Sequence, residues 1–183
     1  MFMRTERLFL RPVFPEDWRG IYRGIADFGV VSMLARAPWP YSEDDARKFC
    51  ADAQAGKENR FVITLPGRAG ASVIGMIGFG PQDTGGRQEL GYWIGTDWQG
   101  RGFATEAVHG VTQVAEALGV EVLEAGHYLD NPASGKVLRK AGFTPTGDVE
   151  PTVCMARGGE TLAARRYVKL LGDHAEQVCP VAA

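Results

Sequence analysis

A glycine-rich turn that joins a strand-like segment to a long helix-forming segment constrains the fold of this chain more than any other feature. The strand is predicted over Arg87–Gly95 and the helix over Gly102–Leu118, with Gln99, Gly100 and Arg101 between them. The first N–H groups of a helix lack partners within the helix and lie at the positive end of its dipole. Glycine at positions 100 and 102 leaves room for a phosphate, so the turn is predicted to bind an anion, with Arg101 adding charge. The alternative is an ordinary turn in which the glycines serve only the backbone geometry.

Two nucleotide-binding motifs do not account for this turn. The P-loop pattern GxxxxGK[ST] is absent from the sequence. The spacing Gly100-x-Gly102-x-x-Thr105 approaches the Rossmann pattern, and Glu121 and Glu124 follow at about the distance of a ribose-binding acid. A Rossmann turn belongs to the first βαβ unit of a parallel sheet, whereas an antiparallel meander is predicted to precede this turn. We therefore reject the Rossmann interpretation.

Strand and helix patterns alternate along the chain in the order β-α-α-β-β-β-α-β-α-β-β. Short turns rich in Gly and Pro separate the middle strands, which favours antiparallel neighbours. The remaining predicted strands are Arg7–Arg11, Arg60–Leu65, Ser72–Gly80, Glu121–Tyr128, Thr144–Thr152 and Glu160–Leu170, and the remaining helices begin at Pro15 and Ser42 and cover Asn131–Ala141. This order predicts an α+β domain built on a mixed, mostly antiparallel sheet.

Length and charge narrow the classes of protein further. With 183 residues, the chain is predicted to form one domain over residues 1–172, followed by a loose tail over 173–183. Its formal net charge of −2 argues against a nucleic-acid partner, which usually requires a clear basic excess. No apolar run approaches the length of about 18 residues that a membrane span needs, so no membrane partner is expected.

The cysteines indicate the compartment. Cys50, Cys154 and Cys179 are scattered and form no CxxC pair, which argues against a metal site. Free thiols, together with an N-terminus that lacks the apolar core of a secretory signal, predict a cytoplasmic protein. The oligomeric state stays open, with a homodimer as one option.

Several segments together resemble the GNAT acetyltransferase superfamily. The pattern Gln99-x-x-Gly102-x-Ala104 is similar to the pyrophosphate loop of that family, (Q/R)xxGx(G/A). The segment 131–143 resembles the family pattern NxxSxxxLxKxGF. The opening TERLFLRP at 5–12 and ELGYWI at 89–94 are similar to the branch that contains the Rim-type ribosomal-protein N-terminal acetyltransferases.

The resemblance implies a GNAT fold with splayed central strands, flanking helices and acetyl-CoA as the cofactor. It implies that the strand at Tyr92–Gly95 splays from the strand at Glu121–Tyr128. The pantetheine arm of the cofactor would lie in that cleft and hydrogen-bond to the backbone. The cofactor-binding residues that it implies are Trp93, Ile94, Gln99, Gly100, Arg101, Gly102, Phe103, Ala104, Thr105 and Asn131.

Acetyl transfer to an amine needs a neutral amine, a stabilised oxyanion and a partner for the leaving thiolate. Glu89 is the predicted base, acting through water; the alternative is a strand carboxylate paired with Arg87 or another basic residue. The resemblance places the Ser134 hydroxyl beside the thiolate as a hydrogen-bond donor; the alternative is a local cap. Tyr128 is the next candidate beside the thiolate, and His127 the next candidate base.

The predicted acceptor-binding residues are Trp39, Tyr41 and Tyr92. The resemblance places the loop that carries the first two over the cleft, and the alternative is a loop packed on the core. Together, the resemblance and the candidate residues imply an acetyl-CoA-dependent N-acetyltransferase in which a primary amine, either a protein N-terminus or a small amine, attacks directly in a ternary complex. No GxSxG elbow occurs and no cysteine adjoins a histidine, so no covalent nucleophile is expected. Two alternatives stay open: an enzyme for polyamines or aminoglycosides, and a non-catalytic acyl-CoA-binding module.

Overall fold

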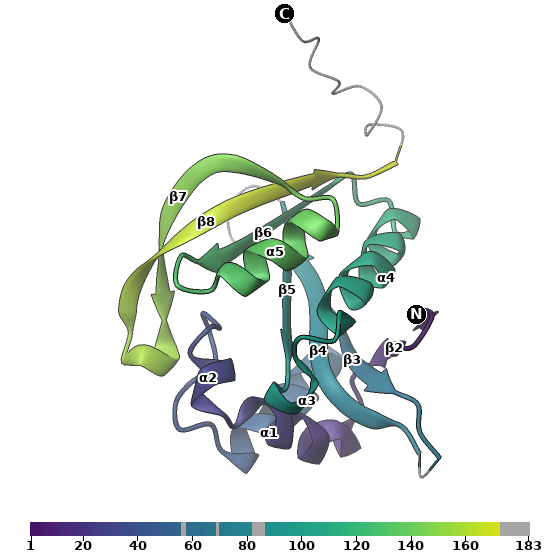
Figure 1. Ribbon diagram of the computed structural model, residues 1–183. Helices are drawn as coiled ribbons and strands as arrows, with labels where there is room; N and C mark the ends of the chain where they lie inside the picture. The colour runs from purple at the N-terminus through teal and green to yellow at the C-terminus, as the bar shows by residue number, and fades with distance from the viewer. Residues whose placement is uncertain (56–57, 69, 82–86, 173–183) are drawn as a thin grey trace, which may run out of the picture.

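An eight-stranded sheet forms the centre of the computed structural model, which describes residues 1–55, 58–68, 70–81 and 87–172. The strand order is β1-β2-β3-β4-β5-β6-β8-β7 (Figure 1). The strands are β1 (Met3–Arg4), β2 (Phe9–Pro12), β3 (Asn59–Leu65), β4 (Ser72–Pro81), β5 (Gln88–Ile94), β6 (Val122–Tyr128), β7 (Thr144–Cys154) and β8 (Glu160–Leu170). The helices are α1 (Trp18–Ile25), α2 (Phe28–Val31), α3 (Glu43–Ala55), α4 (Phe103–Ala117) and α5 (Pro132–Lys140), with short 3₁₀ turns η1 (Pro15–Asp17), η2 (Thr96–Trp98) and η3 (Met155–Arg157).

One short parallel joint interrupts an otherwise antiparallel sheet. β5 pairs with β6 in parallel only over Gln88–Leu90 and Leu123–Ala125. On either side of this joint, the β4–β5 and β6–β8 pairs each extend over seven residues. Past the joint, β5 and β6 run apart (Figure 1). The structure therefore confirms the predicted α+β class, the mostly antiparallel sheet and the splayed strands.

The predicted elements are present, with shifted ends and two short additions. β1 is one addition and α2 is the other; the Asp27 carboxylate opens α2 by accepting a hydrogen bond from the Gly29 N–H at 2.7 Å. Two or four residues carry too few side chains for periodicity to reveal an element. β2 includes Pro12, because β1 pairs only as far as Leu10 and leaves that edge open to a residue without an N–H.

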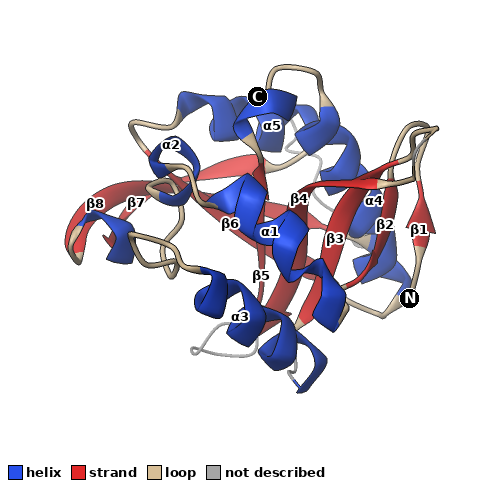
Figure 2. Ribbon diagram, turned by 90° about the horizontal axis from the view of Figure 1, so that it is seen from below, coloured by secondary structure: helices blue, strands red, loops and turns tan. Residues whose placement is uncertain are grey.

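Alternating side chains along the strands build a core on each face of the sheet. On β3, Ile63 packs in the core that contains α4, while its neighbour Val62 packs in the core that contains α1. Ile77 and Met76 divide in the same way on β4. The helices α1 and α3 cover one face and α4 lies on the other (Figure 2). The split between β5 and β6 therefore connects the two faces.

The predicted tail over 173–183, with Cys179, lies outside the described residues, as do 82–86 in the turn before β5. Within the described part of the chain, no three His, Cys, Asp or Glu side chains converge on a possible metal site. None of the helices described there combines the length and the apolar character needed to cross a membrane.

Candidate active site

Beyond its pairing with β6, the edge of β5 faces the split, which is the gap that opens between these two strands. The Gly95 N–H donates a hydrogen bond to the Ile74 carbonyl of β4 at 2.9 Å. Backbone groups of successive residues in a strand point to opposite sides. Tyr92 and Ile94 therefore present their backbone groups to the split, whereas those of Trp93 face β4. Of the two strand positions that the resemblance implies for the cofactor, the backbone of Ile94 faces the split.

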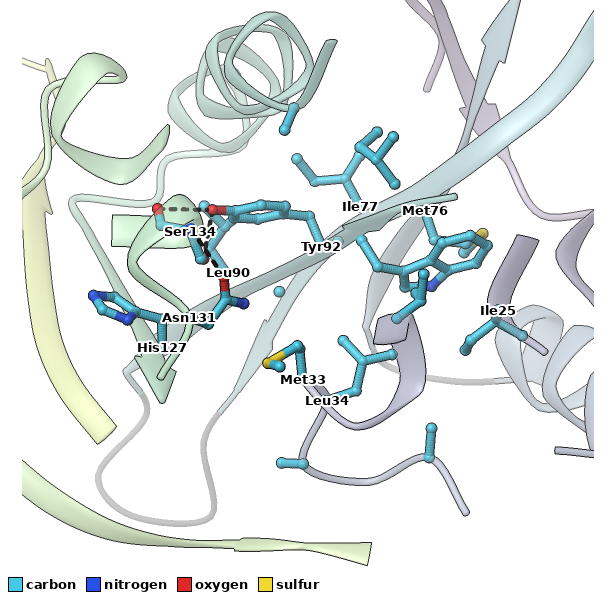
Figure 3. A pocket seen from close by; sticks show the side chains of 18 of the residues that line it. Ile25, Met33, Leu34, Met76, Ile77, Leu90, Tyr92, His127, Asn131 and Ser134 are labelled. Carbon is cyan, nitrogen blue, oxygen red and sulfur yellow. Dashed lines mark hydrogen bonds between the residues drawn. The ribbon is translucent and has the colours of Figure 1, made fainter. Parts of the chain in front are cut away.

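Two hydroxyl groups from different elements meet in the split. Tyr92 Oη and Ser134 Oγ are 2.8 Å apart, and Tyr92 Oη also lies 3.2 Å from the Ser134 carbonyl (Figure 3). Burial raises the pKa of Tyr92 to about 12, so its hydroxyl keeps its proton at neutral pH. The sequence predicted separate roles for these residues, whereas the structure joins them in one hydroxyl pair.

Asn131, and not the Ser134 hydroxyl, caps α5. Asn131 Oδ1 accepts a hydrogen bond from the Ser134 N–H at 3.2 Å. The Ser134 hydroxyl contacts Tyr92 instead, so the capping alternative is not observed. Tyr128, the other candidate beside the thiolate, donates its hydroxyl to the Val153 carbonyl at 3.0 Å, and burial raises the pKa of Tyr128.

The glycine-rich turn opens α4 with a backbone that requires glycine. Gly100 and Gly102 have φ angles of 74° and 80°, in the left-handed region that costs other residues roughly 1–2 kcal/mol. Gly102 is the N-cap of α4, and a Cβ built on Gly100 would meet no atom within 4 Å. The Gln99 side chain donates to the Ile94 carbonyl at 2.8 Å and so ties this turn to the end of β5. Open space above unpaired helix N–H groups fits an anion such as a pyrophosphate.

Arg7 and Glu106 form an ion pair that holds the glycine-rich turn in place, a contact that the sequence analysis did not predict. Arg7 Nε donates to the Glu106 carboxylate at 2.7 Å, and Arg7 Nη1 donates to the Arg101 carbonyl at 3.1 Å. Thr5 donates a further hydrogen bond to Glu106 at 2.6 Å. Burial opposes ionisation of Glu106, but the hydrogen bonds from Thr5 and Arg7 outweigh it and lower the pKa of Glu106. Arg7 and Glu106 lie 99 positions apart, so no local pattern could have paired them.

Most of the predicted cofactor residues line one cavity of about 1110 Å³. Arg101 is the exception: its side chain is exposed and lies over the Trp98 ring, 5.3 Å from the ring centre. Lys136 and Lys140 of α5 also line the cavity. The predicted cofactor residues that line it are Trp93, Ile94, Gln99, Gly100, Gly102, Phe103, Ala104, Thr105 and Asn131. The residues present therefore fit a coenzyme A thioester along this side of the cavity.

Glu89 lines the same cavity and carries an ion pair. Its carboxylate accepts a hydrogen bond from Arg166 Nη1 at 2.7 Å. Arg166 also lies 3.5 Å from Glu124 and 3.4 Å from Glu150, while Arg87 pairs with Glu124. The paired-carboxylate alternative is thus observed, with Arg166 as the partner instead of Arg87. At about 3.3 Å per residue, Glu89 stands roughly 10 Å along β5 from the hydroxyl pair, a distance that requires a chain of water molecules.

His127 is held on the α5 side of the sheet. Its Nδ1 lies 2.7 Å from the Tyr128 carbonyl and its Nε2 lies 3.3 Å from Tyr167 Oη. Arg139 donates to the same Tyr167 oxygen at 3.0 Å. Because the Tyr128 carbonyl can only accept, the Nδ1 atom donates to it, and Nε2 faces the Tyr167 hydroxyl. A Cβ on Gly135 would meet Nε2 at 2.5 Å, so α5 packs directly on this ring.

The predicted acceptor residues take different places. Tyr41 is buried and lines the cavity on the side of α1–α3. Trp39 is 44% exposed, lies outside the cavity lining and packs edge-on against Phe28, with ring centres 5.2 Å apart. Trp93, which the sequence assigned to the cofactor through its backbone, places its indole against Gly24 of α1. The indole of Trp93 therefore faces the acceptor side.

Two curated relatives match most of the chain. The uncharacterized N-acetyltransferase YnaD of Bacillus subtilis (strain 168) is 24% identical over 161 residues, which cover 87% of this chain and 91% of the relative. The uncharacterized N-acetyltransferase p20 of Bacillus licheniformis is 30% identical over 148 residues, which cover 78% of this chain and 82% of the relative.

Solved structures share the fold at low sequence identity. An acetyltransferase of the GNAT family from Bacillus anthracis superposes with a TM-score of 0.80 at 22% identity, over 93% of this chain and 98% of that one. An acetyltransferase from Salmonella typhimurium that modifies the N-terminal serine of ribosomal protein L7/L12 superposes with a TM-score of 0.74 at 17% identity, over 94% of this chain and 100% of that one. A spermidine N-acetyltransferase from Vibrio cholerae superposes with a TM-score of 0.73 at 21% identity, over 90% of this chain and 95% of that one.

A cavity that passes through a split sheet and reaches a glycine-rich helix N-terminus defines the class, an acyltransferase that uses a coenzyme A thioester. The model of the acetyltransferase (GNAT) domain matches residues 7–144, more than half of the chain. The chain belongs to this GNAT family and is an acetyl-CoA-dependent N-acetyltransferase. Rim-type enzymes are among its structural neighbours, in agreement with the branch that the sequence motifs resemble.

Proposed function

We propose that the enzyme transfers an acetyl group to a primary amine, either a protein N-terminus or a small amine, by direct attack in a ternary complex. One observation carries this proposal: a single cavity contains the open edge of β5, the Tyr92–Ser134 pair and the start of α4. Residues 1–172 would act as one catalytic domain, because both cores pack on the same sheet. Cys50 and Cys154 are buried and form no disulfide among the residues that the structure describes, which suits the predicted cytoplasmic location.

Each group in the cavity has a distinct task. The start of α4 with Gln99 would hold the pyrophosphate, and Asn131 would hold the amide arm. The Ile94 N–H would stabilise the negative charge that develops on the acyl oxygen. The Ser134 hydroxyl would donate a hydrogen bond to the departing sulfur while it accepts one from Tyr92, whose pKa of about 12 keeps it protonated.

Direct attack is favoured over a covalent enzyme intermediate. A thiol nucleophile must ionise near neutral pH, whereas burial raises the pKa of Cys50 to about 11. Cys154 is buried and its Sγ lies 3.4 Å from the Ser32 and Leu34 carbonyls, so it is engaged in packing. The amine itself is then the nucleophile, and Glu89 would accept its proton through water.

The experiment that tests this function measures thiol release from acetyl-CoA in the presence of N-terminal peptides, simple monoamines, polyamines and aminoglycosides. Turnover with at least one amine, with the acetylated product identified by mass, is expected. If acetyl-CoA binds and none of these amines is acetylated, the proposed transfer to a primary amine is contradicted.

Glu89→Gln tests the base. The substitution removes the proton acceptor, so turnover is expected to fall by about 10²–10⁴-fold while acetyl-CoA affinity changes little. The matched control is Glu124→Gln, which removes another carboxylate beside Arg166 from outside the cavity lining and is expected to keep its turnover. Rate against pH is measured for both. If Glu89→Gln keeps the wild-type profile, the base lies elsewhere, and His127 becomes the next residue to replace.

A further inference from the structure

We infer that the acceptor is a singly charged primary amine attached to a bulky apolar group, and that Met33 and Leu34 form the wall that selects it. This inference rests on the proposed function and assigns the substrate class of the same cavity. It follows from three observations: the acceptor side has an apolar lining, hydrogen bonds hold the segment that forms this lining, and the carboxylates in the cavity already have hydrogen-bond or ion-pair partners.

The acceptor side of the cavity is lined mainly by apolar side chains. Ile25 and Met76 are each 5% exposed, while Met33 and Leu34 are half-buried. Figure 3 shows Met33 and Leu34 next to each other, with Ile25 and Met76 farther from Ser134. Unbranched Met side chains adapt to the shape of an apolar partner. An apolar group that enters beside them leaves water, and this burial is the main source of affinity in such a pocket.

The Arg157 side chain holds the segment that carries Met33 and Leu34. Arg157 Nε donates to the Ser32 carbonyl at 3.0 Å, and Arg157 Nη2 lies 3.5 Å from Met33 Sδ. The Asp130 carboxylate accepts a hydrogen bond from the same guanidinium at 2.6 Å. Farther along, the Met155 N–H donates to the Ala35 carbonyl at 3.0 Å. These bonds hold the wall in place, and a preformed wall selects by shape.

The described carboxylates that line the cavity already have partners. Asp45 bonds to Ser42 at 2.8 Å, and Asp52 bonds to Lys48 at 2.7 Å. Glu58 is paired with Arg36 at 3.3 Å and with Arg60 at 2.9 Å, and Glu89 is paired with Arg166 at 2.7 Å. The described cations that line it are Arg36, Lys48, Arg60, Lys136, Lys140 and Arg166.

Three of these four carboxylates are paired with cations and Asp45 is bonded to the neutral Ser42, so the lining offers few counter-charges to a polycation. A polyamine that binds in the cavity takes at least one ammonium group, beyond the reacting one, out of water. A charge that is removed from water without a partner is strongly unfavourable. The cationic lining adds repulsion between like charges. A monoamine avoids both costs, because its one charge is lost when the amine is deprotonated for attack.

The test compares kcat/KM of the wild-type protein at saturating acetyl-CoA for four acceptors. The acceptors are 2-phenylethylamine, ethylamine, spermidine and a short peptide amide with N-terminal phenylalanine. We expect 2-phenylethylamine to exceed ethylamine by at least about tenfold, since even one methylene group in an apolar pocket changes kcat/KM by about 10–200-fold. Spermidine is expected to be the poorest acceptor. The ratio of peptide to free amine then shows whether the apolar group belongs to a protein N-terminus or to a small molecule.

Leu34→Ala tests the wall itself. It is expected to reduce the preference for 2-phenylethylamine over ethylamine by about tenfold or more. The matched control is Leu118→Ala, which makes the same change at a 48% exposed position at the end of α4 and should preserve the preference. The inference would be overturned if the wild-type protein preferred spermidine, or if Leu34→Ala lowered kcat/KM equally for all acceptors. The wild-type comparison does not depend on whether the variant folds.

Failure of the proposed function can be told apart from failure of this inference. Thermal shifts of the CoA-saturated protein with the same amines report binding without turnover. A larger shift with 2-phenylethylamine than with spermidine, in the absence of any acetylated product, supports the assigned class and rejects the proposed reaction. A larger shift with spermidine rejects the assigned class whatever the turnover.

Discussion

At the scale of single residues, the Tyr92–Ser134 pair is the arrangement on which the chemistry depends most. Either hydroxyl can donate across the 2.8 Å that separates them. When Tyr92 donates, the Ser134 proton is free to point into the cavity, and the pair works as one donor. Groups that act as a unit give non-additive losses when they are removed.

We therefore expect Ser134→Ala and Tyr92→Phe each to lower kcat by more than about tenfold, a change of about 1.4 kcal/mol in the barrier. The double variant should lose little more than either single one. Acetyl-CoA affinity should hardly change, because the interaction is made mainly in the transition state. The measurements are steady-state rates, a cofactor titration and a melting curve for each variant.

Tyr128→Phe serves as the matched control for this pair. It removes a hydroxyl that donates to the Val153 carbonyl, so stability should fall by about 0.5–1.5 kcal/mol while turnover is kept. If turnover falls in Tyr128→Phe and not in Ser134→Ala, Tyr128 is the partner of the thiolate. The motif could indicate Ser134, but it could not indicate Tyr92 as its partner, because 42 positions separate them and only the fold brings α5 onto β5.

At the scale of elements, the Arg7–Glu106 ion pair fastens the start of α4 to the segment between β1 and β2. The folded-state pKa of Glu106 is lowered, so its contribution to stability is complete above the unfolded value of about 4.3 and is lost as pH falls through the folded value. We expect Glu106→Gln to be less stable than the wild type by about 1.5 kcal/mol at pH 7. The difference should begin to narrow as pH falls below about 4.3, where the unfolded chain binds a proton that folded Glu106 still resists, and should close only below the lowered folded-state pKa.

Denaturant unfolding from pH 7 to pH 3 measures this difference. Glu6→Gln is the matched control, because Glu6 is exposed and lies one residue before Arg7. A stability difference in Glu106→Gln that stays constant over the whole pH range would contradict the role given to this ion pair. The sequence predicted the helix and its glycine turn from local chemistry, but it did not pair Glu106 with Thr5 and Arg7, because these partners come from the far end of the chain.

At the scale of the whole molecule, the start of α4 couples cofactor binding to stability. A ligand at 100 times its dissociation constant stabilises the fold by about 2.7 kcal/mol. Gly102→Glu strains a backbone with a φ of 80° and adds a negative charge at the helix N-terminus proposed to hold the pyrophosphate, with its Cβ 3.5 Å from Arg7, and we expect it to abolish the acetyl-CoA-dependent rise in melting temperature.

Gly119→Glu is the control for backbone strain. Gly119 has a φ of 76°, close to the 80° of Gly102, but it follows the opposite end of α4. This variant should be destabilised by a similar amount and still respond fully to acetyl-CoA. A wild-type thermal shift in Gly102→Glu would contradict the assignment of the turn.

The sequence was sufficient for the order of the elements, the mixed sheet and the cofactor side, because strand alternation, turns and the glycine motif are local signals. It was insufficient for the acceptor side. There, the predicted Trp39 lies outside the cavity, while Met33 and Leu34 reach it through hydrogen bonds from Arg157, 124 positions away from Met33. Contacts at that separation depend on the assembled fold and leave no periodic signal.

The brevity of the parallel joint between β5 and β6 has a mechanical consequence. Apart from the two-residue β1–β2 pair, the ladders among the five strands on one side and the three on the other are longer than this three-residue joint, so Gln88–Leu90 is where the two parts of the sheet would most easily change their angle, as at a hinge. The width of the active-site opening would then change with the angle at Gln88–Leu90. Arg166 reaches across this hinge to Glu89, so the group proposed to accept the proton also fastens the joint whose angle admits the substrate.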